Sequence, residues 1–168
     1  MLKKESLKEM ENYFGSDTRR ISHARKVTNF ALDILDAENL DNPFFSKTVT
    51  LSGVFHDIGI HEAERKYNSN SGKYQEIEGP PIARGILEKM NIEKDVIDRV
   101  CYIIGGHHTE SKIDNIDFKI IWDADLIVNI EEDNICADKE KVSKIITKSF
   151  KTESGKKLAE KLYLKLKF

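Results

Sequence analysis

A histidine and an aspartate interrupt an apolar run in residues 52–64, which read SGVFHDIGIHEAE. His56 and Asp57 directly follow Val54 and Phe55, where a buried helix is expected to end, and Gly59 lets the chain turn away. Imidazole nitrogens and carboxylate oxygens are common ligands of divalent metal ions. The pair therefore predicts a metal site at the end of a buried helix.

Further metal-competent side chains lie on or beside apolar patterns elsewhere in the chain. They are His23, Glu78, His107, His108, Asp123 and Asp125. Burying an ionised carboxylate costs several kcal/mol unless a cation or hydrogen-bond donors accompany it. One divalent cation shared with the imidazoles would serve several carboxylates at once. We therefore interpret the set as a metal centre assembled from separate segments of the chain.

The order of these motifs resembles that of the HD-domain superfamily of metal-dependent phosphohydrolases. RISHARKV contains His23, GVFHDIG contains His56 and Asp57, and IIWDADLI contains Asp125. The resemblance implies that these four side chains hold a metal ion at the mouth of a helical bundle. Helix phase alone does not choose between Asp123 and Asp125, since both lie on apolar stripes. The family's Ala-Asp pair favours Asp125 and leaves Asp123 as a supporting or capping acid.

Resemblance to the two-metal members of the superfamily implies further ligands. In that branch a histidine precedes Gly-Pro and a His-His element follows later, and His107 and His108 match the second element. Gly105 and Gly106 free the backbone to turn both rings the same way. Before Gly-Pro this chain has Glu78 instead of histidine. Because carboxylate can replace imidazole, we expect Glu78 to be a ligand, with a solvated loop glutamate as the alternative.

The resemblance implies hydrolysis of a phosphate ester or anhydride by a metal-activated water molecule. The expected cofactor is a divalent ion of Mn, Fe, Co, Ni or Mg, bound at one or two sites per chain. Arg20 stands where the family often has arginine before its first histidine, and its planar fork could hold a phosphate. Lys119 is a second candidate for that role. His61 is a candidate proton carrier, with an exposed loop histidine as the alternative.

The motifs leave the substrate and part of the reaction class open. The favoured function is hydrolysis of a small phosphorylated compound, foremost a nucleotide monophosphate or a dinucleoside polyphosphate. A minority of two-metal HD proteins are di-iron oxygenases, so an oxygenase is the second interpretation. A non-catalytic nucleotide-binding module is the third, and the intact ligand set argues against it. Metal content and oxygen consumption would separate the two enzyme classes.

Charge and cysteine content restrict the expected partners and compartment. The chain of 168 residues has 27 basic and 29 acidic residues, so no overall field draws it to nucleic acid or a membrane. Cys101 and Cys136 form neither a CxxC pair nor a zinc clip, and the N-terminal segment has too little apolar length for a signal peptide. We expect a cytoplasmic protein with reduced thiols whose partner is its small phosphorylated substrate. A homodimer is left open.

The elements expected to position these side chains are helices. In residues 16–39, His23 shares an apolar face with Val27, Phe30 and Ile34. Similar patterns predict helices over 44–55, 80–90, 93–104, 118–130, 138–150 and 155–168. No segment shows sustained alternation of period two, so the sequence predicts an all-α protein.

The stretch 65–79 is rich in Ser, Asn and Gly and is expected to be a loop, with Pro80 and Pro81 in the first turn of the next helix. The composition shows no linker and no second domain. We therefore expect a single HD domain over residues 1–168, built as a helical bundle with the metal site between its central helices. Its core would cover about 17–130, with C-terminal helices over 138–168 packed on it.

Overall fold

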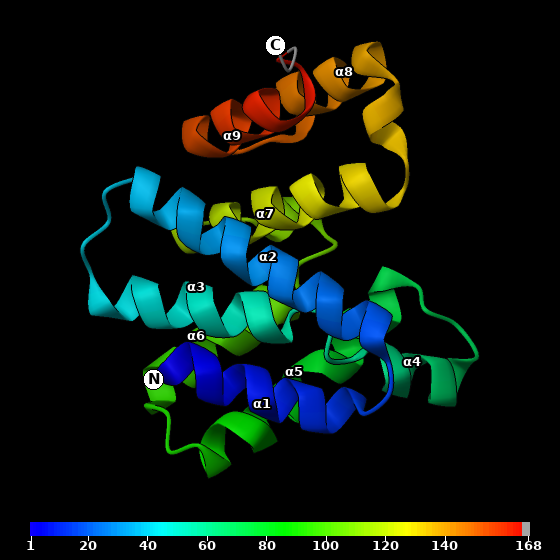
Figure 1. Cartoon of the computed structure of the whole chain (residues 1–168). Coiled ribbons are helices and arrows are strands. Elements are labelled where there is room, and N and C mark those ends of the chain that lie inside the picture. Colours follow the sequence, from blue (N-terminus) through cyan, green and yellow to red (C-terminus); the bar gives the residue numbers. More distant parts are fainter. Residues whose placement is uncertain (166–168) are drawn as a thin grey trace.

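The computed structural model describes residues 1–165, and this part of the chain consists of helices joined by short turns, without a strand (Figure 1). The prediction of an all-α fold is therefore confirmed. In chain order the elements are α1 (Leu2–Phe14), α2 (Thr18–Ala37), α3 (Pro43–Phe55), α4 (Ile60–Tyr67), α5 (Gly72–Lys89), α6 (Lys94–Ile104), η1 (Glu110–Lys112), α7 (Ile116–Glu132), η2 (Ile135–Ala137), α8 (Lys139–Ser149) and α9 (Glu153–Tyr163).

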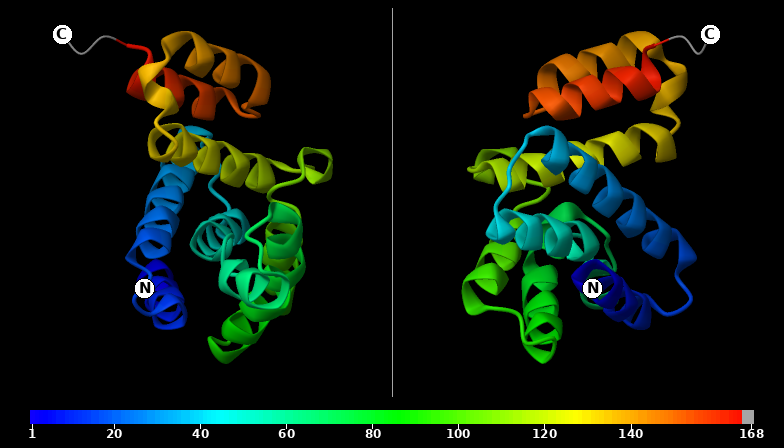
Figure 2. Two further views of the ribbon diagram at one scale, coloured as in Figure 1. Left: turned by 90° about the vertical axis from the view of Figure 1, so that its right-hand side faces the viewer. Right: turned by 60° about the vertical axis from the view of Figure 1, so that its left-hand side comes forward.

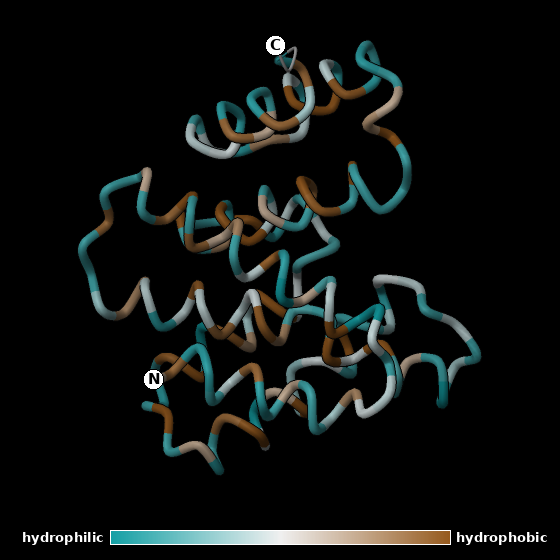
Figure 3. The backbone as a smooth tube through the Cα atoms, viewed as in Figure 1, coloured by the Kyte–Doolittle hydropathy of each residue, from teal (hydrophilic) through white to brown (hydrophobic). Residues whose placement is uncertain are grey.

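Helices α2, α3 and α7 form the centre of the bundle, since α2 packs against both of the others. Figure 2 shows α8 and α9 on one side of α7, with α1 and α3 to α6 on the other. Hydrophobic and hydrophilic positions alternate around the helical turns, as the period of 3.6 residues requires (Figure 3). No helix in the described part of the chain is long and apolar enough to cross a membrane.

The buried apolar side chains form two clusters, and helices α2, α3 and α6 contribute to both. One cluster joins α2 and α7 to the C-terminal helices and includes Ile34, Ile121 and Ile146. The other joins α1, α3, α5 and α6 and includes Leu51 and Leu87. Each fully buried aliphatic side chain stabilises the fold by roughly 1.5 to 3 kcal/mol. The segments that carry the predicted ligands are therefore held from two sides.

The start of α3 determines where the His-Asp pair is placed. The Asn42 side chain accepts a hydrogen bond from the Phe44 backbone N–H at 2.8 Å, and Pro43 occupies the first helical position. A cap of this kind stabilises a helix by about 1 kcal/mol. From this start the buried helix runs to its expected end, so that His56 and Asp57 follow directly at its C-terminus.

The expectation of a loop over residues 65–79 is wrong over most of its length. Helices α4 and α5 cover most of this stretch and are separated by residues 68–71 only. The rings of Tyr67 and Tyr74 stack with their centroids 4.1 Å apart, which ties the end of α4 to the start of α5. This contact joins two polar stretches of the sequence, so hydrophobic periodicity does not reveal it.

Pro80 and Pro81 lie in the interior of α5 and not in a first helical turn. A proline inside a helix removes a backbone hydrogen bond and costs about 3 kcal/mol. Packing on α6 offsets part of this cost. The Cys101 thiol donates to the Pro80 carbonyl at 3.4 Å, and the Pro80 ring lies 3.3 Å from where a Cβ at Gly105 would stand. Tertiary contact therefore overrides the local preference at these residues.

Two side-chain hydrogen bonds join α7 to the C-terminal helices α8 and α9. The Trp122 indole N–H donates to the carbonyl of Ser149 at 3.0 Å. The Tyr163 hydroxyl donates to the carbonyl of Ile127 at 2.7 Å. The helix expected over 155–168 begins two residues earlier, at Glu153, and ends at Tyr163, while residues 166–168 lie outside the described part.

Asp123 is the buried polar link between α7 and the C-terminal pair. Its carboxylate accepts hydrogen bonds from the backbone N–H of Lys151 at 2.7 Å and from the N–H and hydroxyl of Thr152, both at 2.8 Å. Gly155 allows this approach, because a Cβ there would lie 2.5 Å from an Asp123 oxygen. Asp123 therefore fixes the residues that precede α9.

We expect Asp123→Ala to lower the free energy of unfolding by about 3 kcal/mol, because buried donors lose their acceptor at once. Urea unfolding followed by circular dichroism measures this change. Glu140→Ala, on the exposed surface of α8, is the control and should change stability by less than ~0.5 kcal/mol. Asp123→Asn should keep the metal content of the wild type. Equal stabilities for Asp123→Ala and the control would contradict the linking role.

Candidate metal centre

The structure brings most of the expected ligands together in two neighbouring groups. The first consists of His23, His56 and Asp125, and the second of Asp57, His107 and His108. Within each group, one potential ligand atom per residue lies within 4.8 Å of the others. The side chains come from α2, α7, the turn after α3 and the turn after α6.

The first group has the spacing of atoms that share one metal ion. His23 Nε2 lies 3.2 Å from His56 Nε2 and 3.1 Å from Asp125 Oδ1, and His56 Nε2 lies 3.8 Å from the same oxygen. Two ligand atoms bound at right angles to an ion, each at about 2.1 Å, are about 3.0 Å apart. The three side chains therefore need little movement to hold a divalent cation.

Asp57 lies between the two groups and presents one oxygen to each. Its Oδ1 is 3.2 Å from His107 Nε2. Its Oδ2 is 3.6 Å from His23 Nε2 and 3.5 Å from His56 Nε2. A carboxylate in this position can bridge two ions of a dinuclear site, in which the metals are typically about 3.5 to 4 Å apart.

Hydrogen bonds at Nδ1 aim two of the imidazoles at the site. His56 Nδ1 donates to the Gly53 carbonyl at 2.9 Å, and His107 Nδ1 donates to the Ile104 carbonyl at 2.8 Å. These carbonyls belong to the last turns of α3 and α6, where helices leave carbonyls without internal partners. Since a carbonyl only accepts, each Nδ1 carries a hydrogen and each Nε2 is the atom directed at the site.

His23 is oriented by a carboxylate that the sequence analysis did not identify. Glu132, at the end of α7, lies 3.0 Å from His23 Nδ1 through its Oε2. Glu132 and Asn129 follow Asp125 at spacings of seven and four residues, so all of them share one face of α7. That spacing is the signal that could have identified Glu132 and Asn129 as neighbours of the site.

The charges of the site favour a cation between the imidazoles. Burial would lower the pKa of His23, but hydrogen bonding to Asp125 and the charges of Asp125 and Asp57 raise it to about 9. Burial keeps the pKa of His56 below its ordinary value. Burial opposes ionisation of Asp57, yet the neighbouring histidines hold its pKa below the usual range. In the absence of a metal ion, a proton on His23 therefore supplies positive charge, so the donor set fits a divalent cation.

A pocket of about 160 Å³ opens above these side chains. Besides ligands of both groups it is lined by Arg19, Arg20, Ile60, Asn70, Gln75, Asn129, Glu132 and Asp133. Arg19 precedes His23 by one helical turn, which places both on one face of α2. The lining thus adds two arginines and several amide and carboxylate groups to the metal ligands.

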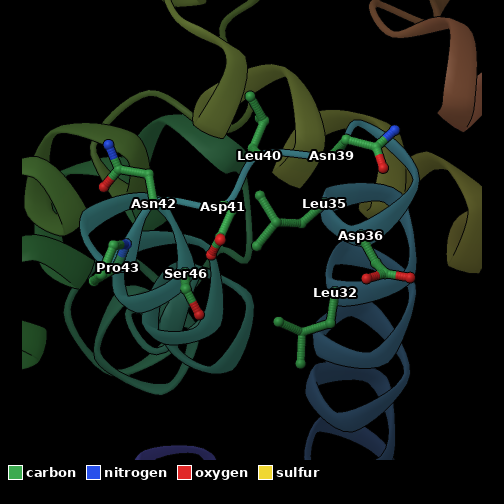
Figure 4. A pocket seen from close by; sticks show the side chains of 9 residues that line it. All are labelled: Leu32, Leu35, Asp36, Asn39, Leu40, Asp41, Asn42, Pro43 and Ser46. Carbon is green, nitrogen blue, oxygen red and sulfur yellow. The ribbon is translucent and has the colours of Figure 1, made fainter.

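A larger hollow of about 670 Å³ lies at the connection between α2 and α3, away from the ligands (Figure 4). Its lining residues include Leu32, Leu35 and Leu40 together with Asp36 and Asp41. It contains no histidine and no residue of either ligand group. Size alone therefore does not locate the chemistry, and the smaller pocket is the candidate site.

Glu78, expected from the motif to be a ligand, belongs to neither group. Its carboxylate accepts hydrogen bonds from the Lys66 ammonium at 2.7 Å and from the Tyr67 hydroxyl at 2.9 Å. Since α5 begins at Gly72, Glu78 lies within a helix packed on α4 and not in a loop free to reach the metal. The early start of α5 is the physical reason for this difference.

The residues expected to assist catalysis are placed differently from one another. The Arg20 guanidinium lines the pocket but is bonded to Asp17 at 2.5 Å and to Glu64 at 2.6 Å. His61 Nε2 lies 2.9 Å from Asp17 Oδ2, so His61 belongs to this peripheral network and does not line the pocket. Lys119 does not line it either.

Binding of the first ion at pH 7 should release about one proton, because the ion must displace the proton that His23 holds up to a pKa of about 9. Apparent affinity should rise with pH by at most about tenfold per unit and level off above pH 9. Titration calorimetry with Mn²⁺ in two buffers of different ionisation enthalpy measures the proton. An affinity independent of pH between about 6 and 9 would show that His23 is neutral.

Glu132→Gln should weaken binding of the first ion by about tenfold or more, because His23 loses the carboxylate that orients its ring. The measurement belongs at about pH 9, where proton competition is small. Glu131→Gln is the matched control, since Glu131 is the exposed neighbour, pairs with Lys26 at 3.4 Å and belongs to neither ligand group. If both variants bind Mn²⁺ like the wild type, Glu132 does not support the site.

Comparison with known proteins agrees with the helical fold. A family model described as the HD domain matches residues 20–165. Among solved structures, a predicted HD superfamily hydrolase from an uncultured Thermotogales bacterium has a TM-score of 0.70 at 23% sequence identity, with 96% of this chain and 84% of that chain covered. At this identity the likeness concerns the fold. No curated protein matches the sequence significantly. Because the family model spans most of the chain and every side chain of the two ligand groups, the protein belongs to the HD-domain family.

Proposed function

We propose that this HD-domain protein is a metal-dependent phosphohydrolase that acts on a small phosphate ester or anhydride, foremost a nucleotide. The observation that carries the proposal is the position of Asp57. One of its oxygens faces His107 and the other faces His23 and His56, at the base of a pocket that Arg19 lines. The HD superfamily hydrolase with the same fold supports the reaction class.

The pocket lining explains why an anionic substrate would require the metal. A divalent cation bound there supplies positive charge beside the phosphate and a water molecule that ionises near neutral pH. The lining includes the carboxylates of Asp57, Asp125, Glu132 and Asp133. These acids repel a phosphate until cations offset their charge, so binding of substrate depends on prior binding of metal.

Arg19 is the side chain best placed to bind the phosphate from the rim. It is exposed, lines the pocket and forms no ion pair within residues 1–165. Arg20, by contrast, is held by Asp17 and Glu64, which neutralise its charge. A guanidinium can donate two parallel hydrogen bonds to phosphate oxygens. The sequence favoured Arg20 as the phosphate-binding residue, and we propose Arg19 in its place.

The size of the pocket limits what it can enclose. A volume of about 160 Å³ accommodates a phosphoryl group, whereas pockets that enclose a drug-sized ligand measure about 300 Å³ or more. The remainder of a nucleotide would extend over the surface, beside Asn70 and the turn between α4 and α5. Discrimination among leaving groups is then expected to be modest.

A phosphate-release screen tests the proposal. Metal-free protein is loaded separately with Mn²⁺, Co²⁺, Ni²⁺, Fe²⁺ or Mg²⁺ and offered nucleoside monophosphates, diphosphates and dinucleoside polyphosphates. We expect phosphate or nucleotide release with at least one combination, and its loss to the background rate in Asp57→Ala, because that variant lacks the carboxylate that faces both ligand groups.

Asp41→Ala is the matched control, because Asp41 is an exposed carboxylate in the hollow between α2 and α3. It should retain the wild-type rate and metal content. Absence of turnover in every combination, together with oxygen consumption by the iron-loaded protein, would replace the hydrolase with an oxygenase. Absence of both activities with intact metal binding would indicate a non-catalytic binding module.

A further inference from the structure

The two ligand groups offer different numbers of potential metal-ligand atoms. His23, His56 and Asp125 share the first group with Asp57 Oδ2, whereas within residues 1–165 the second consists of Asp57 Oδ1, His107 and His108. Glu78, the residue expected to complete the second group, is bonded to α4 instead. A metal site of this kind usually has at least four ligands, so a further donor near His108 would complete it.

The side chain of Gln75 occupies that position. It lies in the first turns of α5, is only 5% exposed and lines the same pocket as Asp57 and His108. Its Oε1 lies 3.3 Å from His108 Nε2. This separation falls within the range of 3.1 to 3.8 Å found among the ligand atoms of the first group.

A hydrogen bond on the other side of the amide determines which atom faces the site. Gln75 Nε2 donates to the carbonyl of Asn70 at 2.7 Å. Because that carbonyl can only accept, the nitrogen must face Asn70 and the oxygen must face His108. If the amide were reversed, Gln75 Oε1 would face the carbonyl oxygen of Asn70, and neither oxygen could donate a hydrogen bond. The turn between α4 and α5 therefore directs a neutral oxygen donor into the second group.

The segment that carries His108 is built onto the same end of α5. Glu76 accepts hydrogen bonds from the His108 backbone N–H at 3.0 Å and from the Thr109 hydroxyl at 2.8 Å. Gly72 approaches the His108 ring so closely that a Cβ there would lie 2.6 Å from the ring. Gln75 and His108 are thus held against each other at the start of α5.

We propose that Gln75 Oε1 is a protein ligand of the second metal ion, in the role that the motif assigns to Glu78. Without an ion, His108 Nε2–H donates to this oxygen. To bind a cation through Nε2, the neutral ring would carry its hydrogen on Nδ1 instead. An amide oxygen is a hard, neutral ligand and adds no negative charge. The second site should therefore bind more weakly than the first and should favour Mn²⁺, Fe²⁺ or Mg²⁺ over softer ions.

The inference rests on the metal centre of the proposed function but not on the reaction, so it is tested by metal binding. Metal-free full-length protein is titrated with Mn²⁺ by calorimetry, and bound Mn²⁺ is followed by electron paramagnetic resonance. We expect two ions of unequal affinity with a coupled spectrum. Gln75→Leu should weaken the second ion by at least about tenfold while the first is retained, and Gln75→Glu should strengthen it.

Glu78→Gln is the matched control and should leave both affinities unchanged, because Glu78 faces Lys66 and Tyr67. Gln75→His separates a ligand from a residue that merely positions His108. A new imidazole ligand should shift the preference of the second site towards Co²⁺ and change the visible spectrum of bound Co²⁺. Unchanged second-ion affinity in Gln75→Leu, or a wild-type protein that binds one ion only, would overturn the inference without affecting a mononuclear hydrolase.

Discussion

Electrostatic repulsion between the carboxylates of Asp57 and Asp125, which both approach His23 Nε2, is the constraint on which this site depends. Two carboxylates and the ring nitrogens of three histidines converge where His56 and His107 are almost wholly removed from solvent. Such a group is stable only if positive charge lies inside it, as a proton or as a metal ion. The raised pKa of His23 and the lowered pKa of Asp57 are two expressions of this requirement. A divalent cation meets it more fully than one proton can.

The fold positions two of the histidine ligands at the ends of helices. Helices α3 and α6 both finish at the site, and each leaves carbonyls that its own turns do not satisfy. His56 and His107 bond to those carbonyls through Nδ1, three residues further along the chain in both cases. One contact thus completes the helix end and orients the metal ligand. The precision of the site therefore depends on where α3 and α6 stop.

Helix α7 serves the site on one face and the C-terminal pair on another. Asp125, Asn129 and Glu132 line the pocket, while Asp123 accepts hydrogen bonds from the residues before α9. Two acids separated by a single alanine therefore have unrelated tasks. Helix α7 is apolar nearly all round, because α8 and α9 cover its outer side. Its two central carboxylates have separate partners: Asp125 lies with the metal-ligand histidines, and Asp123 accepts hydrogen bonds from the residues before α9.

The sequence by itself determined the helical class, the family and the place of His56 and Asp57 at the end of a buried helix. It could do so because a polar pair that closes an apolar helix needs a partner of opposite charge, which a metal ion supplies. Only the tertiary structure decided the tasks of Asp123 and Glu78, as well as the position of Gln75 beside His108. Helical periodicity specifies which face of a helix a residue occupies, whereas its partner is specified by the packing of helices distant in sequence.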